Sequence, residues 1–423
     1  MWHSLEVTKE VLMKIHPCLA QLRAHLESAR YTPKVADRYM AVASYFLRFL
    51  DENRVPVESA QQDHVHAYLR EALRIYRRAH GRRPYIEAGW RLSHTSGIHM
   101  LLRLVQGRWP PEVVPASPTE EFHAQLCSSY VEWLRELRGL APETISGHRA
   151  MAARLLNWLG ERAACSKLAE LTVKDIDSFV AAQPTTLRRT TRKSVALYLR
   201  SFLRYLHGRG LLPRDLSAAV IAPRVYALEN IPSTLSAEDI AAVLKAVQHD
   251  RSSKGRRDLA ILTLLATYGL RAGEVTALRL DDIDWRREQV RVRHSKTGHE
   301  TWLPLVRPVG EALVDYLQKG RPKVASREIF IRARAPYRPF HNGSSLYSGI
   351  VRRLQAAGIK WQGKHGPHAF RHARAVSLLR AAVPSKVIGD VLGHRASAST
   401  AVYLKLATDD LRKIALDVPE VER

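Results

Sequence analysis

A chain of 423 residues, 46% of them hydrophobic, favours two or three domains and excludes disorder as the default state. Lys and Arg total 66 against 41 Asp and Glu, a formal net charge of +25, and the excess is spread along the chain rather than gathered in a tail. This charge indicates a polyanion partner, most simply nucleic acid, although an Arg-rich proteome accounts for it equally well.

Residues 1–112 form the first predicted domain, which is helical and similar in pattern to the next segment of the chain. Thr32-Pro33 opens a helix here, and Ala141-Pro142, about 109 positions later, opens a helix with the same spacing of apolar residues. The two segments also end alike, with Leu102-Arg103 before Gly107-Arg108 and Leu203-Arg204 before Gly208-Arg209. We interpret the first domain as a duplicate of the second, although amphipathic helical bundles can align this well by chance.

The second predicted domain spans residues 118–222, between two Pro-containing stretches, 109–118 and 222–232, that cannot lie inside helices. One of its loops carries four hydroxyl side chains, no acid and four cations, which are Arg188, Arg189, Arg192 and Lys193. At the start of a helix such a loop suits phosphate oxygens, and a solvated basic loop is the alternative. Residues 77–83, with four arginines, occupy a comparable place in the first domain. We expect DNA contact mainly from the second domain.

The third predicted domain, residues 233–423, is mostly helical with a small sheet. Residues 258–268 have the apolar content of a buried helix, which Gly269 is placed to end. Residues 289–293 alternate apolar and polar side chains as a half-buried strand does, and residues 301–305 return as its partner. The domain is therefore predicted to be α-helical around one hairpin.

The third domain contains arginines in a pattern that suits phosphodiester chemistry without a metal ion. Breaking a phosphodiester needs a nucleophile, cations for the developing charge, a base, and an acid for the leaving oxygen. The chain has no clustered Asp or Glu motif of the kind that metals require, so we expect neither a metal nor a cofactor. Arg271 follows Gly269, and Glu274 is placed one turn on to brace its guanidinium. A surface ion pair is the simpler interpretation of this pair alone.

Further candidates follow in the same domain, each of them ordinary by itself. His368 and Arg371 follow Pro367, which suits the first turn of a helix. They lie three residues apart, so one helical face presents an imidazole and a guanidinium to the same phosphate. His394 follows a tight helix end. Tyr403 lies in a predicted helix, where core packing is the usual role of a tyrosine. Lys296 lies at the predicted hairpin tip, where a solvated turn lysine is the ordinary interpretation.

The order of these residues, Arg, hairpin Lys, His-x-x-Arg, Leu-Gly-His and Tyr, resembles the catalytic signature of the tyrosine recombinase (phage integrase) family. The resemblance covers residues 120–410 and is most specific between 365 and 405. It implies a mainly α fold, in which a helical SAM-like core-binding domain, residues 118–222, precedes a mostly α catalytic domain with a small antiparallel β-sheet, residues 233–423. Residues 1–112 would then be a second domain of the core-binding type. Its role is left open among binding accessory DNA sites, extending the grip on the core site and mediating protein contacts.

The resemblance also implies a role for each residue. Tyr403 attacks the scissile phosphate and forms a 3′-phosphotyrosyl link, releasing a 5′-hydroxyl. Arg271 and Arg371 hold the non-bridging oxygens, and Glu274 supports Arg271. Lys296 protonates the leaving oxygen, and His368 assists proton transfer at the tyrosine. His394 donates a hydrogen bond to the phosphate. Religation then consumes neither ATP nor metal, because one phosphodiester is exchanged for another.

The implied function is site-specific recombination by a homotetramer on double-stranded DNA sites, for integration, excision or transposition of a mobile element. Two alternatives stay open. A type IB topoisomerase-like enzyme would relax DNA with the same chemistry, and a non-catalytic relative would only bind DNA. The target sequence, the direction of the reaction, and any accessory proteins or partner recombinases are left open.

Two segments depart from the family pattern or extend it. His372-Ala373-Arg374 follows Arg371 where the family often has a smaller hydroxyl residue, and we expect this segment to add charge near the site. Residues 404–416 keep a helical spacing of apolar side chains. In the family a C-terminal helix commonly docks on a neighbouring subunit. For these residues, such docking and packing on their own domain are equally open.

The cellular location is predicted from cysteine usage and hydropathy. Cys18, Cys127 and Cys165 are widely spaced and form no Cys-x-x-Cys pair, which disfavours a disulfide framework or a zinc site and indicates a reducing compartment. No apolar run reaches the length of a membrane span, and the first residues lack the basic and apolar regions of a signal peptide. We therefore expect a cytoplasmic, DNA-associated bacterial protein.

Overall fold

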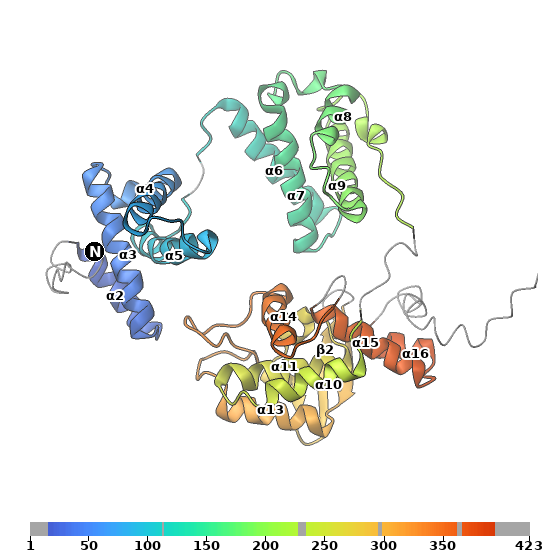
Figure 1. The fold of residues 1–423 in the computed structure, drawn as a ribbon. Coiled ribbons are helices and arrows are strands. Elements are labelled where there is room, and N and C mark those ends of the chain that lie inside the picture. Colours follow the sequence, from blue (N-terminus) through green and yellow to red (C-terminus); the bar gives the residue numbers. More distant parts are fainter. Residues whose placement is uncertain (1–15, 112–113, 227–233, 295–297, 362–365, 394–423) are drawn as a thin grey trace, which may run out of the picture. The chain divides into compact units, whose positions relative to one another are not determined.

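The computed structural model describes residues 16–111, 114–226, 234–294, 298–361 and 366–393 (Figure 1). The chain divides into two compact units, one formed by residues 112–230 and the other by residues 1–111 together with 231–423. Large clusters of buried apolar side chains lie within residues 19–109, 126–220 and 235–373. Each cluster falls inside one predicted domain, and the domain boundaries themselves stay a prediction. No helix in the described ranges is long and apolar enough to cross a membrane.

The first helical body begins each of its early helices at a proline, which has the backbone angle of the first helical turn and lacks a donor that this turn cannot use. Its amphipathic helices bury one stripe each, including Phe46, Leu47 and Leu50 of α3 and Leu69 of α4. The elements are α2 (Pro17–Ser28), α3 (Pro33–Glu52), the 3-10 turn η1 (Val57–Ser59), α4 (Gln62–His80) and α5 (Glu87–Gln106).

The second helical body repeats this order of elements. A 3-10 turn again precedes its third helix, and its second helix again starts at a proline. The elements are α6 (Pro118–Glu136), α7 (Pro142–Leu159), the 3-10 turns η2 (Gly160–Ala163) and η3 (Leu168–Glu170), α8 (Val173–Ala181), α9 (Arg189–Gly208) and η4 (Leu216–Ala219). The shared order agrees with the predicted duplication, which stays a prediction.

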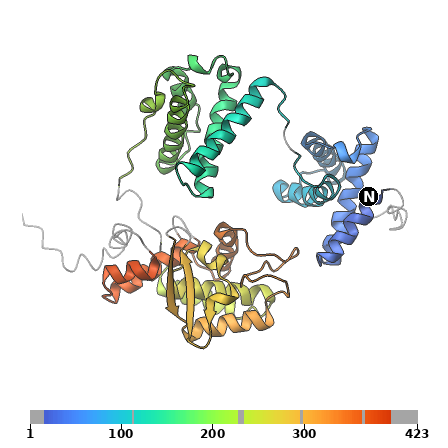
Figure 2. The ribbon, with the colours of Figure 1, turned by 180° about the vertical axis from the view of Figure 1, so that it is seen from behind.

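The third body combines helices with a small antiparallel sheet, as Figures 1 and 2 show. Its helices are α10 (Ala237–Gln248), α11 (Ser253–Tyr268), α12 (Ala272–Ala277), α13 (Arg307–Lys319), α14 (Tyr347–Ala356), α15 (Pro367–Arg380) and α16 (Ser385–Leu392), with 3-10 turns η5 (Leu280–Asp282) and η6 (Gly343–Leu346). Its strands, in sheet order, are β1 (Ile283–Asp284), β2 (Gln289–His294) and β3 (His299–Pro304).

The predicted hairpin is confirmed, with β2 one residue longer than expected. Val290 pairs with Leu303 and Val292 with Thr301 across the antiparallel ladder. Val290, Val292 and His294 are buried, whereas the residues between them are partly exposed. The period of two therefore extends through His294, which faces the interior with the two valines.

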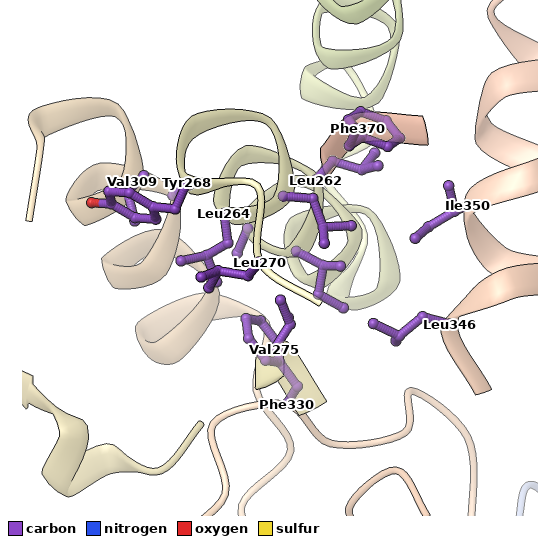
Figure 3. Close-up of a cluster of buried hydrophobic side chains, with 14 of the residues drawn as sticks. Leu262, Leu264, Tyr268, Leu270, Val275, Val309, Phe330, Leu346, Ile350 and Phe370 are labelled. Atoms are coloured by element: carbon purple, nitrogen blue, oxygen red, sulfur yellow. The ribbon is translucent and has the colours of Figure 1, made fainter. Parts of the chain in front are cut away.

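Helix α11 lies at the centre of the core of the third body. Figure 3 shows Leu262, Leu264 and Tyr268 of this helix among buried side chains that include Val275 and Phe370. The helix begins at Ser253, earlier than its apolar run, because the Ser252 hydroxyl accepts from the Gly255 N–H at 3.0 Å and caps the first turn. Gly269 ends the helix in the left-handed conformation, as predicted. Leu270, which follows this cap, is still buried in the core, and the next residue, Arg271, belongs to the candidate site.

Candidate active site

Arg271 occupies the N-terminal cap of α12, directly after the end of α11. Its backbone N–H donates to Glu274 Oε2 at 2.7 Å, and its Nη1 donates to Glu274 Oε1 at 2.7 Å. The Glu274 side chain is 1% exposed and that of Arg271 is 22% exposed. The contact expected from the spacing is present, and it differs from a surface ion pair because the carboxylate is buried.

Glu274 is held as a carboxylate by its hydrogen bonds. Burial acts to raise its pKa, but hydrogen bonds from His294, from the Arg271 backbone and from the Arg271 guanidinium outweigh burial and keep the pKa below its usual value. An ionised Glu274 in turn fixes the orientation of the Arg271 guanidinium, whose remaining N–H groups stay available to an anion.

His294 joins this arrangement, and the sequence analysis did not identify it. Its Nδ1 lies 2.8 Å from Glu274 Oε1 and its Nε2 lies 3.0 Å from Thr301 Oγ1, so the ring links α12 to both strands of the hairpin. The side chain is fully buried. The available signal was the alternation of Val290 and Val292, which places His294 on the inward face once the strand is continued by one residue.

Arg371 reaches the same region from α15. Its Nη1 donates to the carbonyl of Gly269 at 2.9 Å, and its Nη2 donates to the carbonyl of Leu392 at 2.6 Å. Arg271 Nη2 donates to the next carbonyl, that of Gly393, at 3.4 Å. The two arginines, predicted to act on one phosphate, therefore meet at consecutive carbonyls where α16 ends. Arg371 is 3% exposed, which gives its guanidinium a fixed position.

Gly393 is required where it stands. It ends α16 with φ of 63°, and a β-carbon added there would lie 2.5 Å from His294 Cε1. A larger residue would therefore be strained and would also collide with a buried ring. The predicted residues that follow, His394 and Tyr403, lie outside the described residues, and so does Lys296, two positions after His294.

His368 lies in the first turn of α15, which begins at Pro367 as predicted, and its side chain is exposed. His372 is one turn further on, and the two rings stack with centroids 6.2 Å apart. Burial, together with the neighbouring His368 and Arg371, lowers the pKa of His372 to about 4. His372 is therefore neutral at pH 7, and the charge expected from residues 372–374 comes from the guanidinium of Arg374.

The four predicted DNA-binding cations lie at the start of α9. Arg188 is the N-terminal cap residue, and Arg189, Arg192 and Lys193 fall in the first two turns. All four side chains are exposed, and the first turn of the helix contains no acid. Arg192 Nη2 donates to the carbonyl of Thr185 at 2.6 Å, which ties the loop to the helix. The arrangement presents positive charge and helix N–H groups together, as a phosphate site requires.

Chemically, the described arrangement has the charge and the donors that suit an anion. Two guanidinium groups converge on the end of α16, each held in a fixed orientation by a carboxylate or by backbone carbonyls. Across the described part of the chain, no group of three or more His, Cys, Asp or Glu side chains lies close enough together to hold a metal ion. A planar guanidinium matches two phosphate oxygens at once and stays charged at every physiological pH.

Comparison with known proteins gives consistent matches. The model of the phage integrase family matches residues 233–409. The putative integrase/recombinase y4gC of Sinorhizobium fredii is 60% identical over 192 residues, covering 45% of this chain and 98% of the relative. The tyrosine recombinase XerD of Mycobacterium tuberculosis is 28% identical over 301 residues, covering 67% of this chain and 94% of the relative.

The fold is also that of known structures. A lambda integrase tetramer bound to a Holliday junction matches with a TM-score of 0.53 at 17% sequence identity, covering 78% of this chain and 90% of that chain. At this identity the likeness concerns the fold. The predicted fold class, mainly α with a small antiparallel sheet in the third body, is thereby confirmed.

Proposed function

The chain belongs to the phage integrase family of tyrosine recombinases, enzymes that transfer DNA strands, and we propose that it cleaves and rejoins DNA at specific sites through Tyr403. The observation that carries this proposal is the convergence of Arg271 and Arg371 on the carbonyls of Leu392 and Gly393. The proposed nucleophile follows that point by ten residues in the chain. In the sequence, the two residues whose carbonyls accept from these arginines thus come just before the segment that contains the tyrosine.

In the proposed mechanism the Tyr403 oxygen attacks the phosphorus of one DNA strand and the bond to the 5′-oxygen breaks. His368 accepts the phenol proton and Lys296 gives a proton to the leaving 5′-oxygen. Arg271 and Arg371 hold the non-bridging oxygens, and His394 donates a hydrogen bond to the same phosphate. In the second step a 5′-hydroxyl attacks the phosphotyrosine and releases Tyr403. The number of phosphodiester bonds is unchanged, so no external energy source is consumed.

The fixed arginines explain how a tyrosine can act near neutral pH. The unperturbed pKa of a tyrosine is about 10, so attack needs a base and a cationic site. Arg371 is held by two carbonyls and Arg271 by Glu274, so neither guanidinium has to reorganise when charge grows on the phosphate. Losing one donor from a preorganised site of this kind typically costs about 3 kcal/mol, on the order of a hundredfold in rate.

The proposed partners are double-stranded DNA sites and further copies of the chain. The exposed cations of α9 support phosphate contact outside the catalytic site. Two related structures are a lambda integrase tetramer bound to a Holliday junction and the recombinase XerH bound to its difH substrate. By analogy, we propose a homotetramer on two DNA sites that integrates, excises or transposes a mobile element. The relatives lend no support to the topoisomerase alternative, and accessory proteins stay a prediction.

Trapping the covalent intermediate tests the proposal. The full chain would be incubated with labelled, nicked duplexes that tile the DNA flanking its own gene, in the presence of chelator, and resolved on denaturing gels. The wild type should give one slow-migrating band that is protease-sensitive and confined to one fragment. Tyr403→Phe should give none, whereas Tyr226→Phe, which changes a tyrosine 61% exposed outside the site, should behave as the wild type. A band that persists in Tyr403→Phe would contradict the proposed nucleophile.

A further inference from the structure

The first helical body has a basic corner at the place that the cations of α9 occupy in the second. In both bodies this is the connection between the third and fourth helices. Helix α4 ends at His80, Gly81 turns the chain with φ of 66°, and α5 begins at Glu87. Five arginines lie in the last two turns of α4 and in this connection, without any Asp or Glu between them, and they are Arg74, Arg77, Arg78, Arg82 and Arg83.

Most of this charge is not neutralised within the protein. All five arginines are exposed. Arg74 pairs with Glu71 at 2.6 Å, and Arg83 lies 3.8 Å from Glu87. Within the described ranges no carboxylate comes within ion-pair distance of Arg77, Arg78 or Arg82.

The placement of these charges works against the helix that carries them. Arg74, Arg77 and Arg78 are three and four residues apart, so they share one face of α4, where like charges repel. The negative end of the helix dipole offsets part of this repulsion for the last turn. It does not act on Arg82, which follows Gly81 outside the helix. A polyanion along this corner would offset the repulsion among all three unpaired arginines.

Apolar and aromatic groups lie among the arginines. Tyr76 and His80 stack with ring centroids 4.1 Å apart on α4. Tyr85 is fully exposed and Ile86 is 65% exposed, immediately after the last arginine. Arginine and tyrosine side chains exposed together are typical of surfaces that contact the DNA backbone, because both donate hydrogen bonds to phosphate oxygens. A protein partner would need a matching acidic face to cover the same corner.

We propose that Arg77, Arg78 and Arg82 bind the phosphate backbone of double-stranded DNA, so that the chain grips DNA at a second place besides the cations of α9. The contact is to phosphates, so it is independent of base sequence. It rests on the proposed function for the presence of DNA. It assigns to residues 16–109 a role that the sequence analysis left undecided among accessory DNA sites, a longer grip on the core site, and protein contacts.

The salt dependence of binding tests this proposal in the full chain. One variant, Arg77→Gln/Arg78→Gln/Arg82→Gln, removes the three unpaired cations. Its control, Lys34→Gln/Arg38→Gln/Arg48→Gln, removes three exposed cations of α3 from the same body. Binding to a long duplex of random sequence would be measured over a range of salt concentrations. Each phosphate that is no longer neutralised lowers the slope of log K against log salt by about 0.9, so we expect a decrease of about 2 to 3 for the first variant.

The control should keep most of the wild-type slope. Equal slopes for the two variants would overturn the proposal. A second variant combines Tyr85→Ser with Ile86→Ser. If it changes the oligomeric state without changing the DNA affinity, the corner is a protein surface and the proposal is overturned. The covalent trap separates this result from the proposed function. The triple variant keeps Tyr403 and should still form the covalent band on a short core fragment whichever way the slopes fall.

Discussion

His294 connects the candidate site to the hairpin that carries Lys296. Its ring bridges the Glu274 carboxylate and the Thr301 hydroxyl, and it packs against Gly393. His294 thus contacts Glu274 of α12, Thr301 of β3 and Gly393 at the end of α16. We infer that it positions these three elements without touching DNA.

Replacing His294 should therefore slow cleavage more than it weakens binding. We expect His294→Ala to lower the rate of covalent-complex formation by about 10- to 100-fold with DNA affinity nearly unchanged, because a buried donor to Glu274 is removed. His294→Asn, whose amide can still donate to the carboxylate, should recover part of the rate. Single-turnover cleavage and equilibrium binding would be compared with His299→Ala, which changes the exposed residue paired with His294 across the β2–β3 ladder. An equal loss of affinity and rate would contradict a positioning role.

His372 gives the domain a pH-dependent stability. Its pKa in the folded protein is about 4, below the ordinary histidine value near 6.5, so the unfolded chain binds the proton more tightly than the folded one. The stabilisation linked to neutral His372 is therefore fully present above pH ~6.5. It is lost as the pH falls towards 4. Urea unfolding between these pH values should show a smaller decrease for His372→Asn than for the wild type. His299→Asn, an exposed histidine, should follow the wild type, and identical curves for all three would contradict the prediction.

The end of α16 is the element on which the site depends most. Both arginines donate to its last carbonyls, and Gly393 turns the chain against His294. We expect Gly393→Ala to lower the free energy of unfolding by about 1 to 3 kcal/mol, because it combines a left-handed backbone with a steric collision. It should also abolish cleavage.

A matched glycine tests whether the effect comes from this close approach. A β-carbon at Gly349 of α14 meets nothing within 4 Å, so Gly349→Ala should keep wild-type cleavage and leave stability unchanged or slightly higher. Thermal unfolding and the covalent trap would be run on both variants. If Gly393→Ala retains both stability and cleavage, the turn does not constrain the site.

Over the whole molecule, the net charge of +25 is expected to appear as strong, salt-dependent DNA binding. Replacing Arg188, Arg189, Arg192 and Lys193 by Gln should weaken binding to all sequences and lower the salt slope by about 3 to 4, since each cation contacts about one phosphate. The same number of exposed cations elsewhere in the second body, Arg135, Arg149, Arg154 and Lys174, provides the control. Loss of binding only for one DNA sequence would indicate base contacts instead.

Local sequence was sufficient to predict the helix starts at Pro33, Pro142 and Pro367, the cap at Gly269 and the hairpin, because each depends on backbone preferences within a few residues. The candidate site residues, each ordinary by itself, indicated the family through their order along residues 271–403. The local signals and this order can both be recognised without knowing what packs against these residues.

Tertiary structure decided the features that depend on contacts between distant segments. His294 looks like the last residue of a strand until the fold brings α12 and α16 against it. The low pKa of His372 arises from its burial and from the neighbouring His368 and Arg371. The hydrogen bonds to consecutive carbonyls join Arg271 to a residue 122 positions away and Arg371 to one 21 positions away. Burial and non-local hydrogen bonding set these properties, and neither is contained in a local pattern.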